Sequence, residues 1–158
     1  MEEFTSWNIM KMLNIQHERF REWLKFGYIR PSIQPAKGTG TKALFNRTDV
    51  YVVGAFKQLI ENGYSRVHAA TCASQIYQKG ASSAKYAIFR FIYYRNLEWV
   101  NVGIRKDDSK KKDVGHLDVK FATNHVDVQN HFSEDAFWDQ LIVLNLEKLR
   151  REIDEIIG

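Results

Sequence analysis

The sequence predicts an α+β protein in which four helices precede a small antiparallel sheet and a long C-terminal helix. Apolar residues recur at helical spacing within residues 5–26 and 48–78, and alternating β-branched and aromatic residues follow from residue 85. Of the 158 residues, 44% are hydrophobic, which is enough to bury a core. The small, flexible stretch "GASSA" (80–84) stands where the pattern changes. We therefore divide the chain into residues 1–79 and 80–158.

Two short helices are predicted at the start of the chain. The first covers residues 5–13 and can be capped by Thr5 or Ser6. An asparagine-led turn separates it from the second, residues 17–26, which ends at Gly27. Two such helices close together, the second carrying basic residues, form a helix-turn-helix pattern. The second helix divides into a core face (Phe20, Trp23, Leu24, Phe26) and an outer face (Glu18, Arg19, Arg21, Glu22, Lys25).

An extended segment with a glycine-containing tip comes next. Both prolines of the chain, Pro31 and Pro35, lie in it and exclude a helix. The stretches "SIQPA" and "KALF" can pair as a small hairpin, and Gly38 and Gly40 allow its tip to turn. A nucleotide-binding loop is a poor alternative. The tip "GTGTK" lacks the spacing of a Walker loop and the third glycine of a dinucleotide fingerprint.

Two further helices are predicted after the hairpin. Residues 48–62 form the third helix, capped by Asn46 or Thr48. Ser65 opens the fourth, which runs to Lys79–Gly80. Cys72 lies on this fourth helix among alanines, so we expect it to be a buried small residue.

The second half is predicted to contain the sheet and the last helix. The expected strands are residues 85–94, 98–104 and 117–122, with a short fourth strand around Val126 and Val128 and a charged loop over 105–116. A long helix is then expected from Ser133, with acidic residues in its first turn. Its apolar residues recur at alternating spacings of four and three, which is a seam of about two heptads. The seam consists of Ile142, Leu146, Leu149, Ile153 and Ile156.

The positive charge of the protein is confined to its first half. Residues 1–80 contain 11 Lys and Arg against 6 Asp and Glu, and residues 81–158 contain 12 against 13. This asymmetry suits a polyanion-binding part joined to a neutral part. The longest apolar run is far below the roughly 18 residues of a membrane span. A secretory signal is not expected, and the single cysteine excludes a disulfide framework, so we expect a reducing cytoplasm.

Residues 4–77 resemble the MerR-type winged-helix DNA-binding domain. The matching stretches are "FTSWNIMKMLNI", "FREW", "FGYIRP", "GTGTKALFNRTDVY" and "NGYS", in the family's order and spacing. The resemblance implies a winged helix-turn-helix that binds double-stranded DNA and regulates transcription as a homodimer. Two departures stand out: residues 14–16 replace the family's Gly-Val-Ser, and Glu22 replaces an aromatic residue that often contacts phosphate. The second half does not match the usual family ending.

The candidate DNA contacts follow from the pattern and the resemblance together. Arg21 aligns with the arginine that follows the family leucine on the recognition helix, and Arg is the commonest reader of guanine. The start of such a helix is where major-groove contacts concentrate. Lysines beside the hairpin tip can contact the DNA backbone. The full candidate set is His17, Glu18, Arg19, Arg21, Lys25, Arg30, Lys37, Thr39, Thr41, Lys42 and Arg47.

The heptad seam of the last helix is the candidate dimer contact. One short recognition helix reads only a few base pairs, so two copies are needed for useful affinity. The alternative is an amphipathic helix that covers its own sheet. Other functions also remain open: an architectural or phage-type accessory DNA-binding protein, or a sensor module that binds an unknown effector or protein and is tethered to DNA. We expect no enzyme activity, no cofactor and no metal site; His116, His125 and His131 lack metal-ligand spacing.

Overall fold

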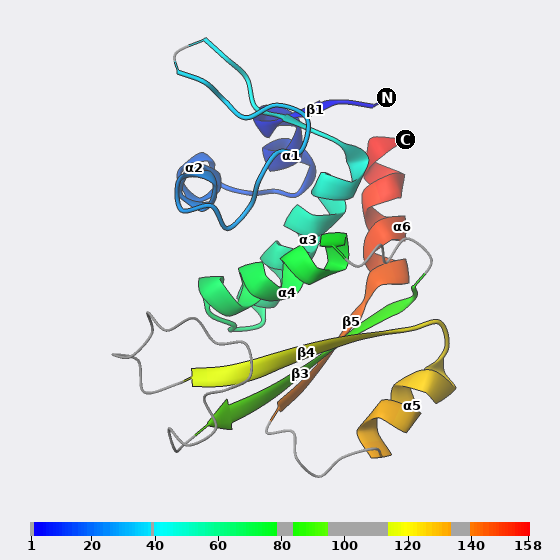
Figure 1. The fold of residues 1–158 in the computed structure, drawn as a ribbon. Coiled ribbons are helices and arrows are strands. Elements are labelled where there is room, and N and C mark those ends of the chain that lie inside the picture. Colours follow the sequence, from blue (N-terminus) through cyan, green and yellow to red (C-terminus); the bar gives the residue numbers. More distant parts are fainter. Residues whose placement is uncertain (1, 39, 79–83, 95–113, 134–139) are drawn as a thin grey trace. The chain divides into compact units, whose positions relative to one another are not determined.

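The computed structural model describes residues 2–38, 40–78, 84–94, 114–133 and 140–158. Over these residues the protein is α+β, with six helices and two small antiparallel sheets (Figure 1). The elements are β1 Phe4–Thr5, α1 Ser6–Met12, α2 His17–Lys25, β2 Leu44–Phe45, α3 Arg47–Glu61, α4 Arg66–Gln78, β3 Tyr86–Tyr94, β4 Val114–Ala122, α5 His125–Ser133, β5 Gln140–Asn145 and α6 Leu146–Ile157. They form two compact units, Met1–Ser82 with Leu146–Gly158, and Ser83–Asn145.

The helix starts of the first unit follow their capping residues. At α1, the Asn8 backbone N–H donates to Thr5 Oγ1 over 3.3 Å, and the Thr5 N–H donates to Asn8 Oδ1 over 2.9 Å. This reciprocal capping box satisfies two donors that the helix itself leaves unpaired. Asn14, with φ of 50°, makes the left-handed turn before α2, and Gly27, with φ of 71°, follows its end. The predicted helix pair is therefore confirmed.

The core of the first unit is aromatic and is supplied largely by α2 and α3. Phe20 is 1% exposed and Trp23 is 4% exposed, and the Trp23 ring meets Phe56 edge-on with centroids 4.9 Å apart. Phe26 was predicted to share this face, and that was wrong, since it is 59% exposed. Each three-residue step from Phe20 to Trp23 to Phe26 drifts about 60° around the helix, which takes Phe26 away from the core.

The extended segment after α2 pairs only at its base. Gln34 and Leu44 form an antiparallel bridge, in which the Leu44 N–H donates to the Gln34 carbonyl over 2.8 Å. β2 pairs in turn with β1, so that Phe4 lies opposite Phe45. The predicted pairing of "SIQPA" with "KALF" is thus present as a single bridge extended by the N-terminal strand.

One buried carboxylate closes this extended segment. Asp49 is 4% exposed, and its Oδ2 accepts hydrogen bonds from the Ser32 N–H at 3.0 Å, the Ser32 hydroxyl at 2.6 Å and the Asn46 N–H at 2.9 Å. The Asn46 side chain caps α3 by accepting from the Asp49 N–H at 2.8 Å. A single oxygen therefore joins both ends of residues 32–46 to the start of α3.

The C-terminal helix is shorter than the sequence predicted, and it packs against α3. It begins at Leu146, whereas Ile142 lies on β5. Leu146, Leu149 and Ile153 are buried, and the side chains of the last two lie against Gly54 on α3. A Cβ atom at Gly54 would come within 2.8 Å of Ile153 Cδ1, so glycine permits this close approach. The helix therefore covers α3.

The second unit is a three-stranded antiparallel sheet in the order β4-β3-β5. Phe89 at the centre of β3 lies opposite Val119 on β4 and Ile142 on β5. Ala87 and Phe89 on one face of β3 are buried, and so are Ile88 and Arg90 on the other. β4 begins at Val114, inside the segment predicted as a charged loop. The predicted strand 98–104 and most of the predicted linker lie outside the described residues.

The predicted fourth strand around Val126 is wrong, because these residues form α5. The Asn124 side chain accepts from the Asp127 N–H over 2.8 Å, as an N-cap does. Val128 continues the helix by donating its N–H to the Asn124 carbonyl. The cap and the following helical turn thus outweigh the β propensity of the two valines.

Replacing Asp49 by alanine is expected to destabilise the first unit by about 2–4 kcal/mol, because three buried or partly buried donors lose their acceptor. The free energy of unfolding, from a urea titration, measures this. Ser32→Ala is the matched control: it removes one of the three hydrogen bonds and should cost only about 1 kcal/mol. Equal losses in the two variants would contradict the role assigned to Asp49 Oδ2.

Candidate nucleic-acid interface

The outer face of α2 is charged and open to solvent. Glu18, Arg21 and Lys25 follow one another at steps of three and four residues, so they share the side of the helix opposite the buried Phe20 and Trp23. The Glu18 side chain is 88% exposed. The helix therefore packs on an aromatic core through one face, and the charged groups of its other face are accessible to solvent.

The two arginines of α2 are exposed at the surface of the first unit. Arg19 and Arg21 are exposed and make no hydrogen bond or ion pair with the described part of the chain. Lys25 lies over the ring of Phe26, with Nζ 5.8 Å from the ring centroid. The guanidinium groups of Arg19 and Arg21 are thus available for an anionic partner.

Glu22, the acidic residue that departs from the family pattern, is held by another helix. Its Oε1 accepts from Arg66 Nη1 over 2.6 Å, at the start of α4. The ion pair engages the Glu22 charge and links α2 to α4. Sequence reasoning missed this pair, because the two residues are far apart in the chain.

The tip of the extended segment is a tight glycine turn flanked by lysines. Gly38 and Gly40 have φ of 79° and 92°, which side chains rarely adopt. The Thr41 hydroxyl donates to the carbonyl oxygens of Lys37 and Gly38, so this predicted DNA contact is used to close the turn. Lys37 and Lys42 are exposed. Thr39 lies outside the described residues.

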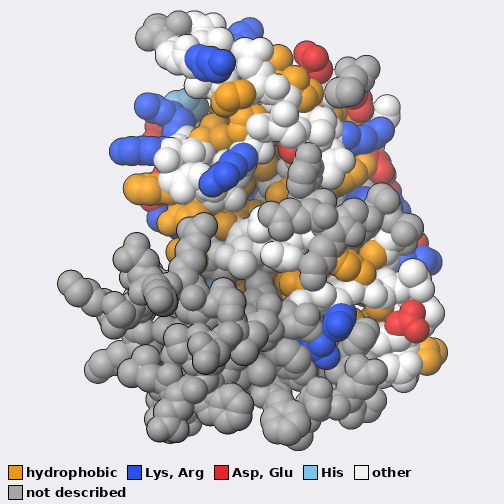
Figure 2. Space-filling view, in the orientation of Figure 1, with side chains coloured by type: hydrophobic (Ala, Val, Ile, Leu, Met, Phe, Trp, Pro, Cys, Tyr) orange, Lys and Arg blue, Asp and Glu red, His pale blue; other side chains and the backbone are white. Residues whose placement is uncertain are grey.

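Positive charge gathers over α2 and the tip. Both lie on the same side of the first unit (Figure 1), and Figure 2 shows Lys and Arg side chains over them at the upper left. Residues 17–42 contain six Lys and Arg against two acidic residues, Glu18 and Glu22. Arg30 is exposed too, with its guanidinium beside Gly27. The net charge of this basic surface is positive, as the binding of a polyanion requires.

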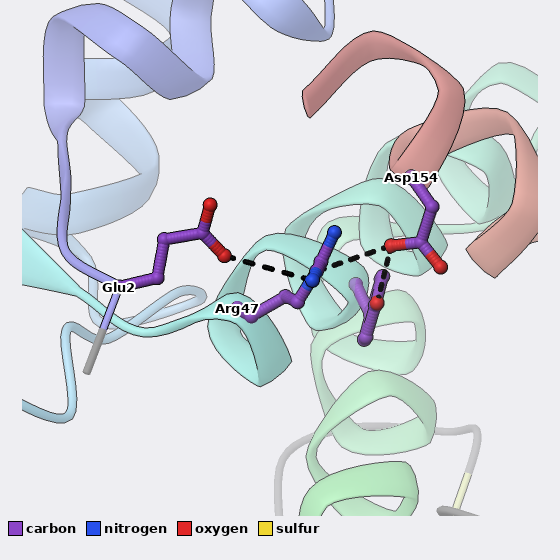
Figure 3. Close-up of polar contacts among 4 residues, drawn as sticks. Glu2, Arg47 and Asp154 are labelled. Carbon is purple, nitrogen blue, oxygen red and sulfur yellow. Dashed lines mark hydrogen bonds and ion pairs between the residues drawn. The ribbon is translucent and has the colours of Figure 1, made fainter. Parts of the chain in front are cut away.

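Arg47 was predicted to contact phosphate, but its guanidinium is engaged within the chain. It lies 3.2 Å from Asp154 on α6 and 3.6 Å from Glu2 (Figure 3). The Tyr51 hydroxyl also donates to Asp154, over 2.6 Å. Burial and, after it, the hydrogen bond to Asp154 raise the pKa of Tyr51. Arg47 therefore ties the start of α3 to α6 and to the N-terminal segment.

The histidines of the second unit were considered as metal ligands in the sequence. His125 contacts the Tyr86 ring, and the side chains of His116 and His131 lie outside the description. No three His, Cys, Asp or Glu side chains among the described residues come together as a metal site. None of the helices in the described ranges is long and apolar enough to cross a membrane.

Comparison with known proteins adds no family assignment: no protein-family model and no curated protein matches this chain.

Cys72 is the one cysteine, and it is expected to be unreactive in the folded protein. It is buried on α4, and burial raises the pKa of its thiol from 9.0 to about 12. Since the thiolate is the reactive form, the folded protein should react with a disulfide reagent at pH 8 on the order of a thousandfold more slowly than the unfolded chain. Absorbance of the released thiol measures the two rates.

A matched control moves the thiol to the neighbouring exposed position. The double variant Cys72→Ala/Thr71→Cys carries its thiol at a position that is open to solvent, so it should react at nearly the unfolded rate. Native Cys72 reacting within tenfold of that rate would contradict its burial.

Proposed function

We propose that the first unit is a winged helix-turn-helix that binds specific double-stranded DNA, and that the protein regulates transcription as a MerR-like homodimer in the cytoplasm. In this proposal α2 is the recognition helix and enters the major groove. The tip at residues 37–42 is the wing, and it contacts the neighbouring phosphates. No catalytic step and no cofactor are part of the proposal.

The observation that carries the proposal is the two-sidedness of α2. The helix buries Phe20 and Trp23, and on the opposite face it leaves Arg21 exposed, with no hydrogen bond or ion pair to a described residue. Lys37 and Lys42 extend the same basic surface at the tip. A rigid helix with available arginines and a flanking basic loop suits base contacts in a groove combined with backbone contacts beside it.

Pairing of two copies is proposed from the size of the recognition helix. The nine residues of α2 span only a few base pairs, so a second copy is needed for useful affinity. The predicted seam is largely occupied, since Leu146, Leu149 and Ile153 are buried in their own chain. Of its helical members, Ile156 alone remains open to a partner, at 53% exposure.

Selection of bound fragments from a random double-stranded DNA pool tests the proposal. A transcription regulator of this kind should enrich one motif made of two symmetric half-sites. An architectural protein would instead retain DNA without a motif, and a tethered sensor would retain little DNA at all. Either of these results would replace the proposal by the corresponding alternative.

Arg21→Ala should weaken binding to the selected DNA by about 1–3 kcal/mol and relax the preference at one position, because one base-reading side chain is lost. Fluorescence anisotropy titrations at fixed salt measure the affinity. Arg151→Ala, which removes an exposed arginine from α6, is the matched control and should bind nearly as the wild type does. Equal losses for the two variants would show that only net charge matters.

A further inference from the structure

We infer that Glu18 is the specificity-determining acceptor of α2 and selects a cytosine in the major groove, an inference that rests on the DNA-binding function proposed above. Glu18 is one of two acidic residues on the basic surface, and the two are placed differently. Glu22 is neutralised by Arg66 at 2.6 Å. Among the described residues, Glu18 pairs only with the His17 ring, at 3.7 Å, and that ring is charged only when protonated.

Because of its position, the Glu18 carboxylate lies inside any complex that forms on this face of α2. It lies in the first turn of α2, three residues before Arg21 and seven before Lys25, on the face opposite Phe20 and Trp23. Whatever approaches this face to meet Arg21 also covers Glu18. A carboxylate brought among phosphates and removed from water costs free energy unless it receives hydrogen bonds.

The chemistry of the base edges then selects the partner. Cytosine presents only a donor, its N4 amino group, to the major groove, and Glu accepts from it. Adenine presents its N6 donor beside the N7 acceptor, and a carboxylate repels that second atom. Guanine and thymine present acceptors there. Cytosine is therefore the base that a carboxylate at this position satisfies without conflict.

A structural role for Glu18 must be separated from base reading. The N-cap of α2, Gln16, makes no side-chain cap hydrogen bond, and Glu18 is the acidic residue of the first turn. Its negative charge therefore also stabilises the helix, through a favourable interaction with the helix dipole. Loss of that interaction would lower the thermal stability of the protein, but it would leave the preferred base unchanged.

Selection from the same random double-stranded DNA pool, run with wild type, Glu18→Gln and Glu18→Ala, tests the inference. The wild type should enrich cytosine at one position in each half-site, by roughly tenfold or more over the other bases. Glu18→Gln should shift that position to adenine, because an amide can donate to N7 and accept from N6. Glu18→Ala should lose the preference there while it binds unrelated DNA more tightly.

Glu155→Gln, which removes an exposed carboxylate from α6, is the matched control and should select the wild-type motif. If both Glu18 variants also keep the wild-type motif, Glu18 serves only the helix, and the inference is overturned while DNA recognition stands. If the wild type enriches no motif, the proposed function fails, and this inference fails with it.

Discussion

The position of the glycine tip within the basic surface depends on one buried carboxylate, that of Asp49. Its Oδ2 receives hydrogen bonds from Ser32 and Asn46, which are the two ends of the segment that carries the glycine tip. A segment of this length, with one antiparallel bridge, gains little order from its own pairing. The fixed position of its ends on α3 is what holds the two tip lysines on the same side as α2. An uncompensated buried carboxylate would be costly, and the three donors provide the compensation.

The charged residues of the first unit fall into two groups, those that pair within the chain and those that remain accessible. Arg47 and Glu22 pair within the chain, with Asp154 and Arg66 respectively, and join helices to one another. Arg19 and Arg21 make no such contact with a described residue. Exposed ion pairs contribute little to stability. Their chief consequence is that the Arg47 guanidinium is engaged within the chain and that the Glu22 carboxylate, which would repel an anionic partner, is paired with a cation. What remains accessible is a basic face with one acidic group, Glu18.

The sequence predicted the helices of the first unit well, because capping residues and amphipathic patterns mark them. Asn46 is an example, since it caps α3 through a hydrogen bond to Asp49, only three residues away. The prediction failed where two readings of one pattern compete. The spacing of four between Ile142 and Leu146 fits a helix, yet Ile142 pairs with Phe89 in the sheet, and the helix begins only at Leu146. The candidate site was found from residue type and resemblance. The ion-pair partners of Arg47 and Glu22, Asp154 and Arg66, are distant in sequence, and no local pattern reveals them.

The most direct measurement is the change of backbone amide NMR shifts when the full chain is titrated with its selected DNA. The account predicts that the largest changes fall on α2, residues 17–25, and on the tip, residues 36–42. Residues of α6 should change least, because Leu149 and Ile153 face α3. Changes concentrated on α6 or on the sheet, with α2 unaffected, would contradict the claim that α2 and the tip together form the DNA-binding surface.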